Sequence, residues 1–206
     1  MTVIPFRRRP AFGSCPPAGR RHRLAVLAAL VLLPGAALGV RASGVLGSAS
    51  DRTLPSSLAV ATVAPGLLRG GGPADVDLLR LRDDHGVRAV VAVGGMAVEE
   101  QAATRALGQR SLQLAVADGA APSADELVRL VRFLRSATGT GVVYLHDRDG
   151  HGPVLVTAAL LRVLRGVPAT TALDELRAAS ERPVTAAEAR AVSTVRSWPQ
   201  LRGESW

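Results

Sequence analysis

Two kinds of apolar pattern alternate along residues 58–206. Short, almost continuous apolar runs bounded by Gly, Pro or Asp are typical of buried strands, whereas longer segments with a helical spacing of apolar residues are typical of helices. The predicted strands are residues 58–63, 67–69, 87–93, 112–116 and 142–145. The predicted helices are residues 73–84, 98–107, 153–164, 169–180 and 185–197, together with one that begins at Ser123. This alternation predicts an α/β domain in which helices cover a central sheet, with further helices at the C-terminal end.

The helix that begins at Ser123 has a complete local pattern. Ser123 and Glu126 have the spacing of a capping box, in which each side chain accepts a hydrogen bond from the backbone N–H of the other residue. Its apolar residues follow at i, i+3, i+4 and i+7 and form one stripe that faces the sheet: Leu127, Leu130, Val131 and Leu134. The helix over residues 153–164 is apolar almost throughout, so we expect it to be buried.

The segment between the strand 142–145 and the helix 153–164 contains Gly150 and Gly152. A glycine-containing loop between a buried strand and the first turn of a helix can form an anion site, because its backbone N–H groups and the helix dipole point to the same spot. The pattern therefore predicts an anion-binding loop at residues 147–153.

Residues 1–57 differ in composition from the predicted domain. Residues 1–23 are arginine-rich without an acidic residue, residues 24–40 are mostly apolar, and residues 41–57 are rich in Gly, Ser and Ala. A basic segment followed by an apolar one is typical of an export signal, either a cleaved signal peptide or an uncleaved signal anchor. The sequence thus predicts an N-terminal hydrophobic helix, a flexible linker, and a domain over residues 58–206 that lies outside the cytoplasm, membrane-anchored or secreted.

The net charge of +8 comes from the N-terminal region. Seven of the 25 basic residues lie in the first 41 positions, which leaves 18 basic against 17 acidic residues in the remainder. A nearly neutral domain in a chain with 3% aromatic residues lacks the basic face and the stacking side chains of a nucleic-acid-binding protein, so we expect no nucleic-acid partner. The single cysteine, Cys15, precedes the domain and leaves it without a thiol for a disulfide, a zinc site or catalysis. We expect neither a metal ion nor another cofactor.

The sequence GVVYLHDRDGHGPVLVTAALLRVLRG, residues 141–166, resembles the active-site region of cysteine-dependent tyrosine and dual-specificity phosphatases. In that family an apolar strand leads into His-Cys, five further residues, an arginine and a helix. Residues 63–95, VAPGLLRGGGPADVDLLRLRDDHGVRAVVAVGG, are similar to the family's opening, a strand that ends in an Arg-Ser/Gly-Gly-x-Pro turn, then a helix and a Gly-Val/Ile strand. GVPATTALDEL, residues 166–176, is similar to the helix after the signature. The resemblance covers about residues 61–176 and implies a phosphatase-like, mostly parallel central sheet flanked by helices.

The resemblance also assigns positions within the loop. His146 matches the family's histidine and Gly150 its loop glycine, but Asp147 stands at the position of the nucleophilic cysteine and Pro153 at that of the phosphate-binding arginine. The degenerate signature loop consists of His146, Asp147, Arg148, Asp149, Gly150, His151, Gly152 and Pro153. Asp118 loosely matches the acid that protonates the leaving group in relatives, and a plain Asp-Gly turn is the other interpretation of that position.

Without the cysteine and the arginine, the domain lacks the thiolate that attacks phosphorus and the guanidinium that holds the phosphate oxygens. A carboxylate at a helix N-terminus is stabilised by the helix dipole and by free N–H groups, so we expect Asp147 or Asp149 to occupy the anion site from within. The resemblance therefore implies a catalytically impaired phosphatase-like domain that acts as a binding or regulatory module for an unidentified protein or phosphorylated partner. A purely structural role is not distinguished from this one by the sequence.

Two other interpretations of the loop involve a metal ion. Asp147-Arg148-Asp149-Gly150 resembles the Asp-x-Asp-Gly motif of haloacid-dehalogenase-type phosphatases, in which the first aspartate is the nucleophile, the second is the acid, and magnesium is bound. That motif normally opens its domain and works with a lysine, whereas here it comes late in a chain without lysine. Asp147 and Asp149 also alternate as calcium ligands do, but no glutamate follows at the distance that a calcium loop needs. An active phosphatase, with this aspartate nucleophile or with residual activity of the cysteine-dependent type, is the alternative function.

Overall fold

The computed structural model describes residues 58–204 and residue 206. The segments that the sequence predicts at residues 1–23, 24–40 and 41–57 lie outside the described residues. Among the helices of the described part, none has both the length and the apolar character to cross a membrane.

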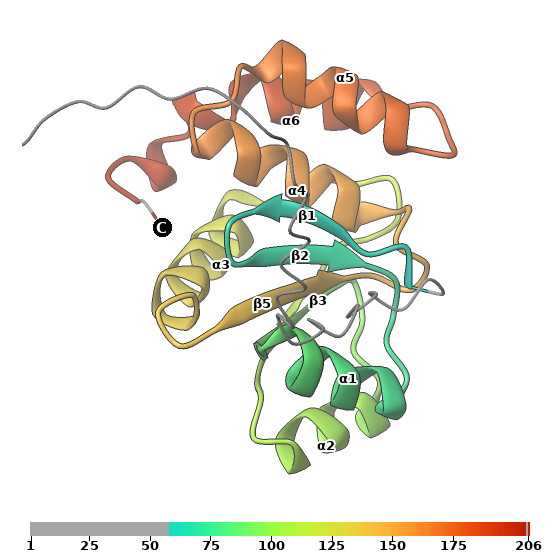
Figure 1. Ribbon diagram of the computed structural model, residues 1–206. Coiled ribbons are helices and arrows are strands. Elements are labelled where there is room, and N and C mark those ends of the chain that lie inside the picture. Colours follow the sequence, from blue (N-terminus) through green and yellow to red (C-terminus); the bar gives the residue numbers. More distant parts are fainter. Residues whose placement is uncertain (1–57, 205) are drawn as a thin grey trace, which may run out of the picture. The chain divides into compact units, whose positions relative to one another are not determined.

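A five-stranded sheet forms the centre of the described region (Figure 1). Its strands are β1 (Ala61–Ala64), β2 (Leu67–Gly70), β3 (Val87–Val93), β4 (Arg110–Leu114) and β5 (Val142–His146). They are arranged in the order β1-β2-β5-β3-β4, with β1 antiparallel to β2 and all other neighbours parallel. The predicted mostly parallel sheet is thus confirmed, and β5 is its central strand.

Helices cover both faces of this sheet (Figure 1). They are α1 (Asp75–His85), α2 (Val98–Ala106), α3 (Ala124–Ala137), α4 (Pro153–Leu164), α5 (Ala169–Ala179) and α6 (Ala186–Thr194), followed by the 3-10 turns η2 (Val195–Ser197) and η3 (Pro199–Leu201). Helices α1 and α2 pack on one face and α3 and α4 on the other, while α5 and α6 pack against α4. Because parallel neighbours need long crossover connections, the helices necessarily lie on the faces of the sheet.

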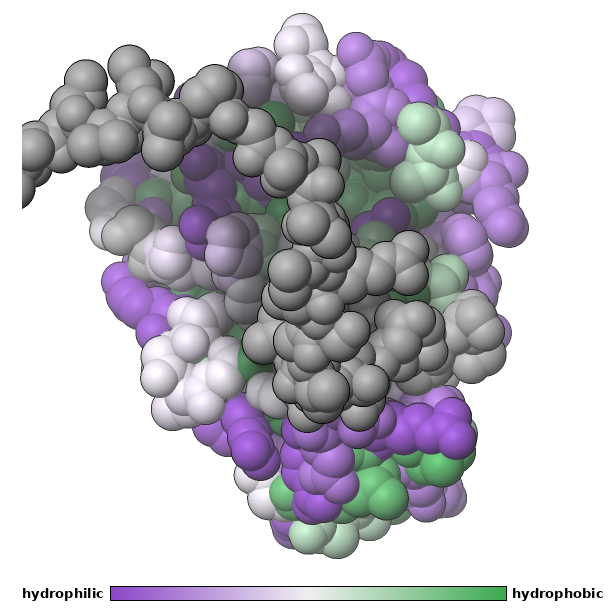
Figure 2. Space-filling view, in the orientation of Figure 1, coloured by the Kyte–Doolittle hydropathy of each residue, from purple (hydrophilic) through white to green (hydrophobic). Residues whose placement is uncertain are grey.

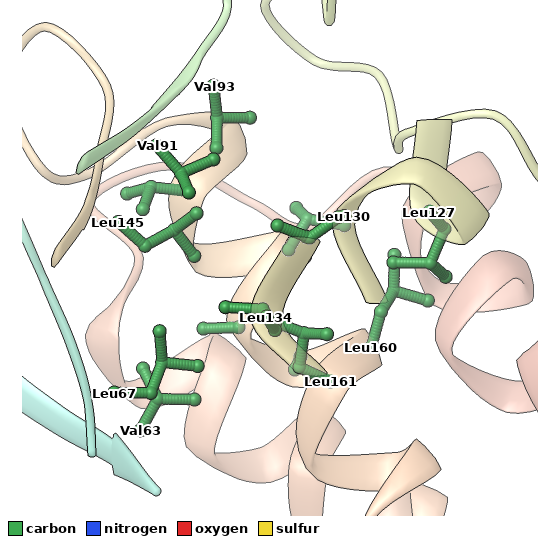
Figure 3. Close-up of a cluster of buried hydrophobic side chains, with 14 of the residues drawn as sticks. Val63, Leu67, Val91, Val93, Leu127, Leu130, Leu134, Leu145, Leu160 and Leu161 are labelled. Carbon is green, nitrogen blue, oxygen red and sulfur yellow. The ribbon is translucent and has the colours of Figure 1, made fainter. Parts of the chain in front are cut away.

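Leucine and valine side chains fill the space between the sheet and helices α3 and α4, as Figure 3 shows. The predicted stripe of α3 is confirmed, since Leu127, Leu130, Val131 and Leu134 are at most 1% exposed. The capping box is also present, with the Ser123 side chain accepting from the Glu126 backbone N–H and the Glu126 carboxylate accepting from that of Ser123. In α4, 10 of the 12 residues are buried, as the apolar composition predicts. Helices α3 and α4 are therefore held firmly against the sheet, and α4 in turn positions the end of the loop that leads into it.

The first and fourth strands differ from the prediction. β1 begins at Ala61 and not at residue 58, because Ala59 has a positive φ of 46° that interrupts the extended backbone before it. β4 begins at Arg110, two residues before the predicted start. Because β4 is an edge strand, several of its side chains are exposed and polar, and the apolar pattern therefore misses its first residues.

The surface carries mixed polar and apolar residues in the view of Figure 2, with apolar surface at the lower edge, where Figure 1 places α1 and α2. The large apolar side chains that stay exposed on these helices are Val76, Leu79 and Val98, at 52%, 41% and 77% exposed. They lie on helices at the face of the sheet opposite to α4.

Candidate functional site

The loop of residues 147–152 joins the central strand β5 to the buried helix α4, at the edge of the sheet where the parallel strands end. An open pocket of about 940 Å³ lies beside the loop. Its wall also contains residues 72–73, residues 93–97 at the end of β3 and just after it, Asp118, and Glu181 and Arg182 of the α5–α6 connection. Ligands of open α/β sheets bind at this edge, outside the carboxyl ends of the strands. The loop thus has the location that the sequence predicts.

Gly150 allows the loop to pack closely against the end of β2. Its φ is +85°, a conformation that favours glycine, and a Cβ atom added there would lie 2.9 Å from the backbone nitrogen of Gly71 and 3.0 Å from the carbonyl carbon of Gly70. Gly72 completes the contact, because its backbone N–H donates to the carbonyl oxygen of Arg148 at 3.1 Å. The glycine-rich turn after β2 and the loop before α4 are therefore one packed unit, although nearly eighty residues separate them in sequence.

Asp147 is the first residue of the loop and its side chain is buried, at 4% exposed. Its Oδ1 accepts a hydrogen bond from the backbone N–H of Gly150 at 2.6 Å, and its Oδ2 accepts one from that of Val154 at 3.0 Å. Val154 lies in the first turn of α4. The carboxylate therefore lies where loop amides and a helix dipole stabilise an anion.

Asp149 is placed differently, because it is exposed and accepts a hydrogen bond from the backbone N–H of His151 within its own turn, at 3.2 Å. Of the two aspartates that the sequence offers for the anion site, Asp147 is the one that the structure places there.

Pro153 is the first residue of α4 and is buried. Proline fits this position because the first N–H of a helix has no acceptor within the helix. It also means that the loop lacks a backbone donor at Pro153, and that no polar side chain enters the pocket from this position.

His146, at the end of β5, is buried at 2% exposed and lies between two oxygen atoms. Its Nδ1 is 3.3 Å from the carbonyl oxygen of Asp147, and its Nε2 is 2.7 Å from Oε1 of Glu100 on α2. The second contact is within ion-pair distance, although neither of its atoms makes a well-directed hydrogen bond. The ring stacks on Tyr144, with centroids 5.8 Å apart. Burial raises the pKa of Tyr144, whose hydroxyl donates to the carbonyl oxygen of Gly71 at 2.7 Å.

Asp118 reaches the same pocket from the loop after β4. A Cβ atom added to Gly152 would lie 3.0 Å from Oδ2 of Asp147 and 4.0 Å from Oδ1 of Asp118. Both carboxylates therefore lie near Gly152, and a side chain at that position would crowd the carboxylate of Asp147.

Arg182 enters the pocket from the connection between α5 and α6 and is held by Glu188. Glu188 is fully buried, and both of its carboxylate oxygens accept hydrogen bonds from the Arg182 guanidinium, one of them at 3.0 Å. The hydrogen bond to Glu188 raises the pKa of Arg182. Burial alone would raise the pKa of Glu188, but the hydrogen bonds from Arg182 and Thr185 together hold that pKa below its usual value.

Two further loop residues, Arg148 and His151, line the pocket. Arg148 is exposed, and Nε2 of the half-buried His151 lies 3.6 Å from a carboxylate oxygen of Glu181. Arg69, near the end of β2, lines a separate, smaller pocket with Leu155 and Arg162. It is half-buried; burial lowers its pKa, and the negative charge of Asp147 opposes that change.

Sequence reasoning missed Glu100, Glu181 and Arg182. Glu100 lies in the first turn of α2, where acidic residues are common for helix stability alone, and the other two lie in a short connection between surface helices. Their approach to the loop depends on tertiary packing, so no local pattern could have identified them. Within residues 58–204 and 206, no group of three His, Cys, Asp or Glu side chains is arranged to hold a metal ion.

Solved structures of cysteine-dependent phosphatases share this fold. The core catalytic domain of the PP-IP phosphatase SIW14 from S. cerevisiae is 12% identical, with a TM-score of 0.57 over 65% of this chain and 82% of that one. TpbA of P. aeruginosa is 21% identical, with a TM-score of 0.56 over 72% of this chain and 89% of that one. A kinase associated phosphatase, solved with its catalytic-site cysteine replaced by serine, is 15% identical, with a TM-score of 0.55 over 67% of this chain and 92% of that one.

At these identities the comparisons establish the fold, which is that of the tyrosine and dual-specificity phosphatases. No protein-family model and no curated protein matches the sequence.

Proposed function

We propose that this chain is a catalytically impaired phosphatase-like domain that serves as a binding or regulatory module. The observation that carries the proposal is the buried carboxylate of Asp147, which accepts hydrogen bonds from the amides of Gly150 and Val154. In the resemblance drawn from the sequence, Asp147 stands at the position of the nucleophilic cysteine. The side chain at that position is thus an internal anion in place of a thiolate.

Electrostatics disfavours a phosphate group in this loop. A phosphate that approached within 4 Å of the Asp147 carboxylate would meet a repulsion of about 4 kcal/mol per pair of unit charges at an effective dielectric constant of about 20. Pro153 offers no guanidinium at the position of the family's arginine, and the only arginine in the α5–α6 part of the pocket wall, Arg182, is engaged by Glu188. The repulsion by Asp147 and the lack of a free guanidinium both act against the binding of a substrate phosphate and against stabilisation of its transition state.

Hydrolysis of para-nitrophenyl phosphate by the purified full-length chain tests this proposal. We expect no turnover above buffer, because residues 58–206 contain no thiol. We expect none with magnesium either, because no three His, Cys, Asp or Glu side chains of residues 58–204 and 206 are arranged to hold a metal ion. The double variant D147C/P153R restores the thiolate and the guanidinium, and we expect it to gain measurable turnover. Turnover by the unchanged chain that Asp147→Ala abolishes would contradict the proposal, and a magnesium requirement would favour the aspartate-nucleophile alternative.

Export and membrane tethering are a second part of the proposal. Their support is the sequence of residues 1–40, in which a basic segment precedes an apolar one. The test is fractionation of cells that express the full-length chain, followed by protease treatment of intact spheroplasts. We expect residues 58–206 to be accessible from outside, and replacement of Leu27 and Leu30 by arginine to retain the chain inside. Complete protection of the unchanged chain would contradict export.

A further inference from the structure

The smaller pocket, of about 250 Å³, is lined by residues of strands β1 and β2 and of helices α4 and α5. Helix α4 packs on the two strands and against α5 in this part of the molecule (Figure 1). Most of the pocket wall is apolar, and small side chains on the two helices leave the space open, since longer ones would fill it. These are the side chains of Ala158 and Ala159 on α4 and of Ala172 and Ala179 on α5.

Three charged side chains also line this pocket, those of Arg69, Arg162 and Glu175. Arg162 and Glu175 form a pair, in which Nε and Nη2 of the guanidinium lie 2.7 Å and 2.8 Å from the two carboxylate oxygens. The third guanidinium nitrogen, Nη1 of Arg162, donates to the carbonyl oxygen of Val63 at 3.2 Å. Both members of the pair are therefore engaged with each other, and their charges cancel.

Arg69 is the cation that this pair leaves over. It is half-buried, and its side chain forms no ion pair or hydrogen bond within residues 58–204 and 206. Burial lowers the pKa of Arg69, because a guanidinium that has lost part of its water is less stable as a cation. An anion beside it would replace the lost water. The two cations and one carboxylate give the pocket a net charge of +1 next to apolar walls.

We propose that this pocket binds a small organic monocarboxylate, whose carboxylate pairs with Arg69 and whose short aliphatic chain packs against the alanines of α4 and α5. The planar fork of a guanidinium matches the two oxygens of a carboxylate, and Thr62 in the same wall offers a hydroxyl donor. Ligand sites are mostly apolar with a few polar groups that fix the orientation, and a volume below about 300 Å³ suits a small ligand.

Inorganic phosphate suits this pocket less well. It has no apolar part to cover the alanine side chains, and Glu175 in the wall repels a dianion more strongly than a monoanion. The inference is independent of the proposed loss of catalysis, because Arg69 and these alanines lie outside the loop of residues 147–152.

Titration of the purified, isotope-labelled full-length chain with hexanoate, followed by nuclear magnetic resonance, tests the inference. Hexanamide has the chain without the charge, and acetate has the charge without the chain. We expect saturable binding of hexanoate and binding of either control that is at least tenfold weaker. The reason is that the carboxylate supplies charge-assisted hydrogen bonds, and that each buried methylene strengthens binding about fourfold. Absence of saturable hexanoate binding, or equal binding of hexanoate and either control, would overturn the inference.

The first pair of variants tests the charge. Arg69→Met removes the guanidinium and keeps a long side chain, and Arg80→Met is its control, because Arg80 is exposed on α1 and lines neither of the two pockets. We expect Arg69→Met to weaken hexanoate binding about tenfold and Arg80→Met to leave it unchanged.

The second pair of variants tests the apolar space and keeps Arg69. Ala179→Leu fills the pocket from the last residue of α5, and Ala178→Leu is its control, because Ala178 is exposed on the same helix and does not line the pocket. We expect Ala179→Leu to weaken hexanoate binding at least tenfold and Ala178→Leu to leave it unchanged. Unaltered hexanoate binding by either folded variant, Arg69→Met or Ala179→Leu, would place the ligand elsewhere and overturn the inference.

Discussion

Asp147 is a charged residue whose carboxylate is 4% exposed and whose two oxygens each accept a hydrogen bond from a backbone amide. Burial of a carboxylate is unfavourable unless such bonds and a favourable dipole compensate for the lost water. The loop and the first turn of α4 supply both. At the scale of single residues, the carboxylate of Asp147 therefore takes the place that a bound anion would have at these two amides.

Replacement of Asp147 by alanine measures how much its carboxylate contributes to the stability of the fold. The amides of Gly150 and Val154 would lose their acceptor, so we expect the free energy of unfolding to fall by about 1–3 kcal/mol in urea titrations of the full-length chain. Asp149→Ala is the control, because Asp149 is exposed and caps its own turn, and a change within about 0.5 kcal/mol is expected there. Equal stability of the two variants would show that the Asp147 carboxylate does not stabilise the loop.

The pair formed by Arg182 and Glu188 gives stability a dependence on pH. The pKa of Glu188 is held below its usual value of 4.5 in the folded chain. The pair therefore stabilises the fold at pH values above the pKa of the unfolded state, and this contribution is lost as the pH falls through the lower pKa of the folded state. We expect Glu188→Gln to lower the free energy of unfolding by about 1–3 kcal/mol at neutral pH, and the difference from the unchanged chain to shrink below pH 4.5. A difference that is constant between neutral and acidic pH would contradict this account.

Part of the site could be predicted at the residue scale. The loop from His146 to Pro153 and the pocket residue Asp118 were identifiable, because they lie in contiguous segments with a recognisable order of residue types. Glu100 and Arg182 were not, since each belongs to a segment whose sequence has an ordinary structural explanation. They join the pocket through the packing of α2 and of the α5–α6 connection.

At the scale of elements, helices α3 and α4 were predicted closely because burial decides their composition. β4 was displaced by two residues because half of an edge strand is solvent-exposed and its polar residues look like a loop. β1 was predicted too early because the positive φ of Ala59 leaves no sign in an apolar sequence. Errors of this kind arise where tertiary packing, and not the local pattern, sets the end of an element.

Contact between the glycine-rich turn after β2 and the loop before α4 can be tested by Gly150→Ala. The added Cβ would approach backbone atoms of Gly70 and Gly71 at 3.0 Å or less, in a residue whose φ is +85°. We expect the free energy of unfolding to fall by about 1–3 kcal/mol, because the neighbouring backbone cannot move away freely and alanine is strained at this positive φ. Gly139→Ala is the control, since a Cβ there meets nothing within 4 Å, and it is expected to be neutral or slightly stabilising in the same thermal or urea melts. A neutral Gly150→Ala would show that the two segments are not tightly packed.

At the scale of the whole molecule, the order of motifs along the chain was a better guide to the fold than sequence identity to solved structures. The compared phosphatases share only 12% to 21% of residues with this chain, yet the described region has their fold. The fold follows from the placement of apolar strands, crossover helices and glycine turns, which many sequences satisfy. Function depends on a few groups in one loop, so the same fold carries it only where those groups are present.

The central claim is that the anion site of this fold is already occupied by the chain's own carboxylate. Crystals of the full-length chain soaked with tungstate test it most directly, because tungstate is an electron-dense mimic of phosphate. We predict that no tungstate lies between the amides of Gly150 and Val154, and that Asp147→Ser, which removes the charge, admits it there. Tungstate bound to those two amides in the unchanged chain would contradict the account.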